Sequence, residues 1–147
     1  MTPTNLSRKR RRGAAAVEMA VVILGCLIFL FAIFEYGRFQ MMRHLVDNAA
    51  REGARQAVVN TNTMTTADIQ NIVTDSLAGQ SFDSVAITVY KANPSTGANI
   101  GAWTDAAFGE GIAVQVNAVY SPMLPTFGFL QASVPISAKV IMRSEAN

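Results

Sequence analysis

The sequence is poor in the residues that build most catalytic and metal sites. It contains one cysteine, Cys26, and one histidine, His44, so it can form neither an intrachain disulfide nor a multi-cysteine metal site. It also lacks a glycine-rich phosphate loop, and its carboxylates are scattered along the chain. We therefore expect no catalytic residues, no metal site and no cofactor, and we predict that the protein is not an enzyme.

Basic residues are also scarce beyond the first part of the chain. Five of the twelve lysine and arginine residues are consecutive, at positions 8–12. After Gly13 there are seven basic residues and all ten acidic ones, so the remainder of the chain is slightly acidic. A nucleic-acid-binding domain needs basic residues spread over a folded face, which this chain does not offer. We expect neither a nucleic acid nor a small-molecule ligand as a partner.

The sequence does contain one long apolar run. Residues 14–34 read AAAVEMAVVILGCLIFLFAIF, and Glu18 is the only charged residue among them. At a rise of about 1.5 Å per residue, about 20 such residues cross the hydrocarbon core of a bilayer. We therefore predict a single-pass membrane protein whose transmembrane helix covers residues 14–36.

The charges that flank this run predict its orientation. The basic cluster comprises Arg8, Lys9, Arg10, Arg11 and Arg12. It directly precedes the run, and basic residues beside a membrane span stay in the cytoplasm. We expect residues 1–13 to form a cytoplasmic leader or tail and residues 37–147 to form one extracytoplasmic domain. Tyr36 and Arg38 fall at the outer membrane surface, where amphipathic side chains are good anchors.

Apolar residues at spacings of three and four predict that the helix continues past Gly37 to about Val59. These residues are Phe39, Met42, Leu45, Val46, Ala49, Ala50, Ala54, Ala57 and Val58. The opposite face carries charges, with Glu52 three positions before Arg55, and is typical of a solvated surface. A second helix is predicted from Thr66, as its N-cap, to a stop at Gly79.

Beyond Gly79 the apolar period changes to two, which predicts β-strands at about residues 85–90, 112–120 and 134–143. A small antiparallel sheet of about three strands needs a cover, and the apolar stripe of the long helix can supply it. We therefore predict an α+β fold. In the long connection 92–111 we expect Trp103 and Phe108 to pack onto the sheet. The apolar segment 123–130 is a candidate contact site.

Three processing signals compete at the N-terminus. A signal-peptidase site of A-x-A type would follow the apolar core, but the alanines at 14–16 precede it. A lipoprotein box ending at Cys26 contains the bulky Leu24 and is followed by apolar residues instead of a polar tether. The third signal places Gly13 at the end of a basic leader, five residues before Glu18.

This third signal resembles the type IV prepilin signature, with a leader ending in Gly13, scission before Ala14 and Glu18 as the fifth residue of the mature chain. Beyond it, the segments RRGAAAVEMAVV, FEYGRF, DNAAREGAR and VPISAKVIMRSE resemble the TadE-like family of the tight-adherence (Flp) pilus system. The resemblance implies a pilin-like fold and a minor pseudopilin of the bacterial inner (cytoplasmic) membrane, with its N-terminus cytoplasmic and its C-terminal domain periplasmic or extracellular.

The resemblance also implies partners. They would be the prepilin peptidase, other pilins and pseudopilins, the inner-membrane assembly platform and the lipid bilayer. By the same resemblance Glu18 pairs with the N-terminal amine of a neighbouring subunit, although pairing with Arg11 or Arg12 within the chain is an alternative. The alternative function is a membrane-anchored envelope or secretion component of the same fold that is neither processed nor part of a pilus.

Overall fold

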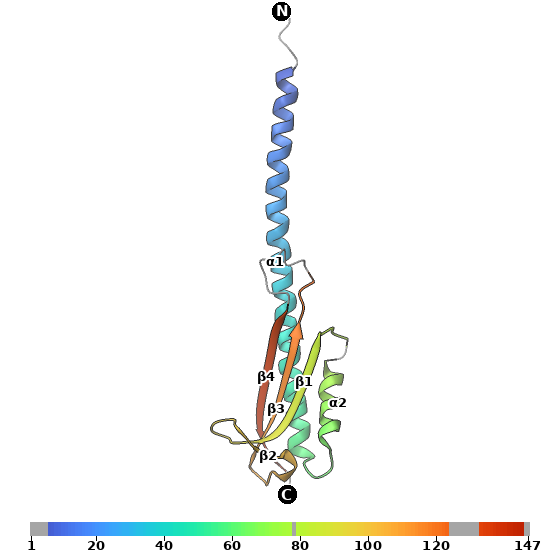
Figure 1. Ribbon diagram of the computed structural model, residues 1–147, viewed down its shortest axis with the longest axis vertical. Coiled ribbons are helices and arrows are strands. Elements are labelled where there is room, and N and C mark those ends of the chain that lie inside the picture. The colour runs from blue at the N-terminus through green and yellow to red at the C-terminus, as the bar shows by residue number, and fades with distance from the viewer. Residues whose placement is uncertain (1–5, 78, 124–132, 146–147) are drawn as a thin grey trace, which may run out of the picture. The chain divides into compact units, whose positions relative to one another are not determined.

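The computed structural model describes residues 6–77, 79–123 and 133–145 (Figure 1). The elements in chain order are helix α1 (Leu6–Val59), helix α2 (Thr66–Ser76), strand β1 (Ser84–Ala92), strand β2 (Asn99–Gly101), the 3-10 turn η1 (Trp103–Asp105), strand β3 (Gly111–Tyr120) and strand β4 (Val134–Arg143). The chain divides into two compact units, residues 1–37 and 38–147, and the second unit is called the head below. The predicted α+β fold, with a long N-terminal helix and a small antiparallel sheet, is confirmed.

The first unit consists of the N-terminal part of α1. From Gly13 to Phe34 every side chain is exposed, including the large apolar ones. Within the described residues, α1 is the one helix that is long and apolar enough to cross a membrane. Because a helix that is apolar all round has no favourable surface in water, the burial pattern supports membrane anchoring by this unit.

The head contains a four-stranded antiparallel sheet with the order β2-β1-β3-β4. Strand β3 is central, since it pairs with β1 from Ser84↔Val119 to Ala92↔Gly111 and with β4 from Gly111↔Arg143 to Tyr120↔Val134. The three predicted strands are present. The short strand β2 was not predicted, because three residues are too few to show a period of two.

The predicted apolar stripe of α1 is confirmed as the cover of this sheet. In the head the apolar side chains that are fully or almost fully buried along α1 are those of Met42, Val46, Ala49, Ala50, Ala54, Ala57 and Val58. They share one core with the inward-facing side chains Ile112, Val114, Val116, Ala118 and Tyr120 of β3. In Figure 1 this part of α1 lies behind the strands, and α2 lies beside β1.

Gly53 marks the point where α1 approaches its neighbours most closely. A Cβ atom at this position would lie 2.4 Å from Cγ2 of Val73 on α2 and 3.4 Å from Cγ1 of Val114 on β3. Any larger residue would have to displace one of these buried, β-branched side chains. Glycine is therefore what allows two helices and a strand to meet here.

The start of α2 differs from the prediction by one residue. Thr65, not Thr66, is the N-cap, because its hydroxyl accepts a hydrogen bond from the Asp68 backbone while the Asp68 carboxylate accepts one from the Thr65 backbone. This is a capping box, which satisfies two backbone donors that the first turn leaves without helical partners. The hydroxyl of Thr66 instead accepts a hydrogen bond of 2.9 Å from Nε1 of Trp103. Gly79 follows the helix with φ of 84°, as expected for a stop.

The two aromatic residues of the 92–111 connection behave differently. Trp103 is buried in the core, as predicted. The prediction for Phe108 is wrong, since its side chain is 72% exposed. Phe108 lies in a turn whose geometry is set by backbone and carboxylate hydrogen bonds, including one from the Ala107 N–H to Glu110, so the turn needs no aromatic anchor.

The end of the described chain is fastened to the rest of the head. The Ser144 N–H donates to the carbonyl of Glu110 at 2.8 Å, and the Glu145 N–H donates to the carbonyl of Val58 at 3.0 Å. The second bond satisfies one of the carbonyls that the last turn of α1 leaves without a helical donor. The predicted contact segment 123–130 lies, except for Met123, outside the described residues.

Candidate functional site

The predicted processing site lies within α1. Gly13, Ala14 and Glu18 are helical and their side chains are exposed, and a Cβ atom placed on Gly13 would meet nothing within 4 Å. Along an ideal helix, five residues correspond to about 7.5 Å, so Glu18 lies more than one turn beyond the predicted scissile bond.

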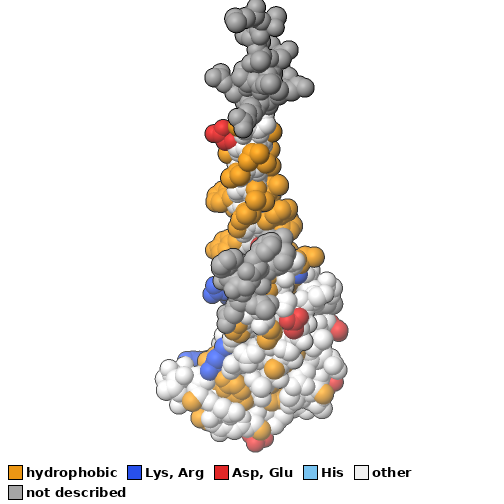
Figure 2. Space-filling model, turned by 45° about the horizontal axis from the view of Figure 1, so that its top comes forward, with side chains coloured by type: hydrophobic (Ala, Val, Ile, Leu, Met, Phe, Trp, Pro, Cys, Tyr) orange, Lys and Arg blue, Asp and Glu red, His pale blue; other side chains and the backbone are white. Residues whose placement is uncertain are grey.

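Among residues 13–34, whose side chains the structure describes, Glu18 is the only charged residue. The nearest large side chains in sequence, Val17, Met19, Val21 and Val22, are all apolar and more than half exposed. Figure 2 shows the same pattern as a long run of hydrophobic side chains on the part of α1 outside the head. A carboxylate in such a setting is costly in lipid unless a positive group pairs with it. The arrangement can therefore recruit a cation.

The basic cluster at positions 8–12 belongs to the first two turns of α1, and its side chains lie outside the description. Its role in orientation, the predicted cytoplasmic tail and the ranges 14–36 and 37–147 stay predictions.

The two predicted membrane-surface anchors have different surroundings. Tyr36 is 63% exposed. Arg38 belongs to the head, where its guanidinium lies 5.1 Å from the centroid of the Tyr120 ring, a cation–π distance. Phe39 packs against the same ring at 5.8 Å in an edge-to-face arrangement. The sequence did not reveal this cluster, because its members are about 80 residues apart and only the folded sheet brings Tyr120 to α1.

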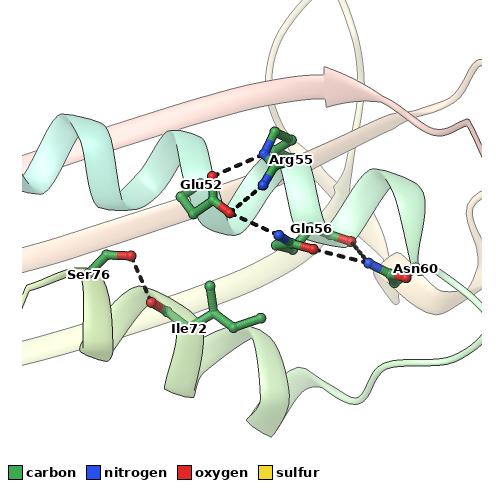
Figure 3. Close-up of polar contacts among 6 residues, drawn as sticks. All are labelled: Glu52, Arg55, Gln56, Asn60, Ile72 and Ser76. Atoms are coloured by element: carbon green, nitrogen blue, oxygen red, sulfur yellow. Dashed lines mark hydrogen bonds and ion pairs between the residues drawn. The ribbon is translucent and has the colours of Figure 1, made fainter.

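A polar network lies on the head part of α1, within the DNAAREGAR segment and just after it (Figure 3). The predicted pair of Glu52 and Arg55 is confirmed: the guanidinium donates two hydrogen bonds to the carboxylate, at 2.7 and 3.0 Å. The side-chain amide of Gln56 donates a third to the same carboxylate at 2.9 Å, and Asn60 in turn donates to Gln56. The bonds from Arg55 and then Gln56 lower the pKa of Glu52 to about 2. The Glu52 carboxylate is therefore charged at neutral pH, and its hydrogen bonds lie along one face of α1.

The described residues offer no group of three or more histidine, cysteine, aspartate or glutamate side chains that could hold a metal ion. Cys26 is a free, exposed cysteine on the apolar part of α1.

These features define a class of protein: an α+β protein whose long N-terminal helix contains a candidate membrane span and, further along, covers the sheet of the head. The family described as TadE-like protein matches residues 13–55. The match begins at Gly13, extends through the DNAAREGAR segment and confirms the TadE-like resemblance over α1, while residues 56–147 lie outside it. No curated protein and no solved structure matches the chain.

Proposed function

We propose that this chain is a minor pseudopilin that takes part in assembly of a tight-adherence (Flp) type IVb pilus. The observation that carries the proposal is the TadE-like match over residues 13–55, which begins at the predicted scissile glycine and includes Glu18. In this function α1 anchors the subunit in the inner membrane, with residues 1–13 in the cytoplasm and the head outside. Its partners are other pilins or pseudopilins and the assembly platform.

The first step is removal of the basic leader by the prepilin peptidase. A peptidase must reach both sides of the bond between Gly13 and Ala14, and no other part of the described chain packs against Gly13. Glycine also weakens the helix locally by about 1 kcal/mol relative to alanine, which eases the unwinding that a peptidase requires. The cleavage removes the five consecutive basic residues and creates a new α-amino group at Ala14.

The second step is subunit pairing through Glu18. A carboxylate within an apolar helix is unfavourable in lipid by roughly 3 kcal/mol on insertion scales. The new amine of a neighbouring subunit supplies the missing positive charge, so Glu18 selects neighbours whose leaders have been removed. The alanines at positions 14–16 and at position 20 allow another helix to approach closely.

Mass spectrometry of the N-terminus tests the proposal. When the full chain is expressed with its prepilin peptidase, we expect a mature chain that begins at Ala14. Gly13→Leu should block the cleavage by placing a bulky side chain at the scissile bond. Gly25→Leu is the matched control, because Gly25 also has no neighbour within 4 Å and lies in the same helix. Cleavage that persists in Gly13→Leu would show that the scissile bond is assigned wrongly.

One observation favours the alternative function. Helix α1 runs through Gly13 without a break, from Leu6 onward, so the predicted leader is continuous with the span. A chain that keeps its basic tail would be an anchored envelope or secretion component of the same fold. An intact N-terminus in the presence of active peptidase would select this alternative.

A further inference from the structure

The head has two ends, and β3 runs from one to the other. At the far end the Glu145 N–H donates to the carbonyl of Val58, in the last turn of α1. The residue before Glu145 donates to the carbonyl of Glu110, just before β3 begins. At the near end the ring of Tyr120, the last residue of β3, lies 5.1 Å from the guanidinium of Arg38, the first residue of the head. Strand β3 therefore runs against the direction of α1.

The near end is joined to the predicted span without a linker. Helix α1 is continuous here, and the predicted span 14–36 ends two residues before the head begins. The headgroup layer on each side of a bilayer is about 5–7 Å thick, which corresponds to about four residues of a helix. If residues 14–36 cross the membrane, the first turn of the head must lie in this layer or directly beside it.

Two large apolar side chains are exposed at the near end. Met41, in the first turn of the head, is 51% exposed, and Met123, three residues after Tyr120, is 73% exposed. Figure 1 shows that the chain continues past the tip of β3, away from β2 and η1. An extended chain advances about 3.3 Å per residue, so Met123 can lie up to about 10 Å beyond the end of the strand. Flexible, apolar methionine side chains fit an irregular apolar partner well.

The near end also offers a cation. Arg43 is exposed, and in the part of the chain that the structure describes its guanidinium makes neither an ion pair nor a hydrogen bond. Side chains on a helix lean toward its N-terminus, which for Arg43 is the direction of the span. Of the nearby acids, Asp83 accepts a hydrogen bond from Ser121, and Asp47 lies one turn farther along α1. A guanidinium in this position suits a phosphate group.

Position, and not exposure alone, distinguishes the near end. The far end exposes apolar side chains to the same extent, with Val59 at 54% and Phe108 at 72%. Along α1, Val59 lies 18 residues after Met41, a distance of about 27 Å. The far end is therefore out of reach of a bilayer that meets the first turn of the head, and its side chains are matched controls for those of the near end.

We propose that the near end of the head is a phospholipid-binding surface, in which Met41 and Met123 enter the headgroup layer and Arg43 binds lipid phosphate. The apolar surface of residues 13–34, all exposed, then continues onto the head, and the same bilayer covers both. The contact rests on the predicted span and goes beyond the proposed function. It does not depend on cleavage at Gly13, which lies before the span, so the two can fail separately.

Thiol labelling tests the contact. The full chain carrying Cys26→Ala and one new cysteine is reconstituted in phosphatidylcholine vesicles, and the reaction of outward-facing heads with a charged maleimide is timed. The first matched pair is Met41→Cys and Val59→Cys, and the second is Met123→Cys and Phe108→Cys. The members of each pair replace side chains of nearly equal exposure. We expect each near-end cysteine to react severalfold more slowly than its far-end partner, and equal rates would overturn the proposal.

Nitroxide-labelled lipid identifies what covers the near end. A fluorophore attached to Met123→Cys should lose much of its emission when lipids with a nitroxide on the headgroup are added, whereas the same fluorophore on Phe108→Cys should keep its emission. Protection from maleimide that weakens as the chain is diluted with lipid would mean that a second copy of the chain covers this end. Such a result, or equal quenching at both positions, would overturn the proposal.

Charge reversal tests the contact with phosphate. Arg43→Glu should raise the labelling rate of Met123→Cys severalfold, because lipid phosphates repel the new carboxylate. Arg51→Glu is the matched control, since Arg51 is also exposed and lies eight residues, or about 12 Å, farther along α1. It should leave the rate unchanged. An equal rise in both variants, or no rise in Arg43→Glu, would overturn the proposal.

Discussion

The junction at Gly53 gives the sharpest test of how the head is packed. Gly53→Ala adds one methyl group to α1 at a point where it would lie 2.4 Å from Cγ2 of Val73. Val73 is fully buried and its β-branched side chain has one strongly preferred rotamer in a helix, so it cannot turn aside. The two helices must separate, or α2 must shift along its axis.

The expected cost follows from two opposing effects. Overpacking a well-packed core typically costs about 1–3 kcal/mol, and a contact this short belongs to the upper part of that range. Replacing glycine by alanine inside a helix stabilises the helix by about 1 kcal/mol. We therefore expect Gly53→Ala to lower the free energy of unfolding of the head by about 1–2 kcal/mol, which corresponds to a fall in Tm of roughly 5–10 °C.

Trp103 supplies the assay, because it is the only tryptophan and it is buried in the head. Its emission during heating of the full chain in detergent or nanodiscs reports unfolding of the head without interference from the membrane helix. Gly37→Ala is the matched control, since a Cβ atom there meets nothing within 4 Å. This variant should be as stable as the parent chain or slightly more stable.

A second variant decides whether Val73 is the cause. In Gly53→Ala combined with Val73→Ala the close contact is absent, so the double variant should lose less stability than the sum of the two single losses. A Gly53→Ala chain that is more stable than the parent, or losses that simply add, would refute the account of this junction.

Two further predictions concern the start of α2 and the polar network of α1. Thr65→Ala should lower stability by about 1 kcal/mol through loss of the N-cap without altering the emission maximum of Trp103. Thr66→Ala removes the acceptor of the indole N–H and should shift that maximum. If instead Thr66→Ala lowers the stability and Thr65→Ala shifts the maximum, Thr66 is the N-cap. The pKa of Glu52 is lowered from 4.5 to about 2 in the head. Its contacts therefore stabilise the head fully above pH 4.5, and this stabilisation is lost as the pH falls toward 2. Unfolding titrations of Glu52→Gln should show a weaker pH dependence in that window, and an unchanged dependence would exclude Glu52 as its source.

Much of the fold could be predicted because local periodicity determines it. The stripe along α1 shows the helical period, and the runs that became β1, β3 and β4 show the period of two. The N-cap of α2 was assigned one residue too late, although the sequence carries the signal: Asp68 lies three residues after Thr65 and completes a capping box, whereas the apolar Ile69 lies three residues after Thr66. What the sequence did not show is the contact of Thr66 with Trp103, 37 residues away.

The candidate site was less predictable because its contacts depend on tertiary structure. The spacing of Gly13 and Glu18 is visible in the sequence, but the stacking of Arg38 on Tyr120 requires β3 to be in place. The exposure of Phe108 also depends on tertiary structure. An aromatic residue in a turn packs against the sheet only if the completed sheet leaves space for it.

The hydrogen bond from Glu145 to Val58 also affects when the head can form. It joins residues 87 positions apart, one in the last turn of α1 and the other just after β4. Strand β3 stays without its second neighbour until β4 has been synthesised, and the last turn of α1 stays open until Glu145 arrives. Such distant contacts slow folding, because a long loop must close before they form. The head of a growing chain therefore stays incomplete until β4 and Glu145 have emerged, and its apolar strand β3 needs protection during that interval.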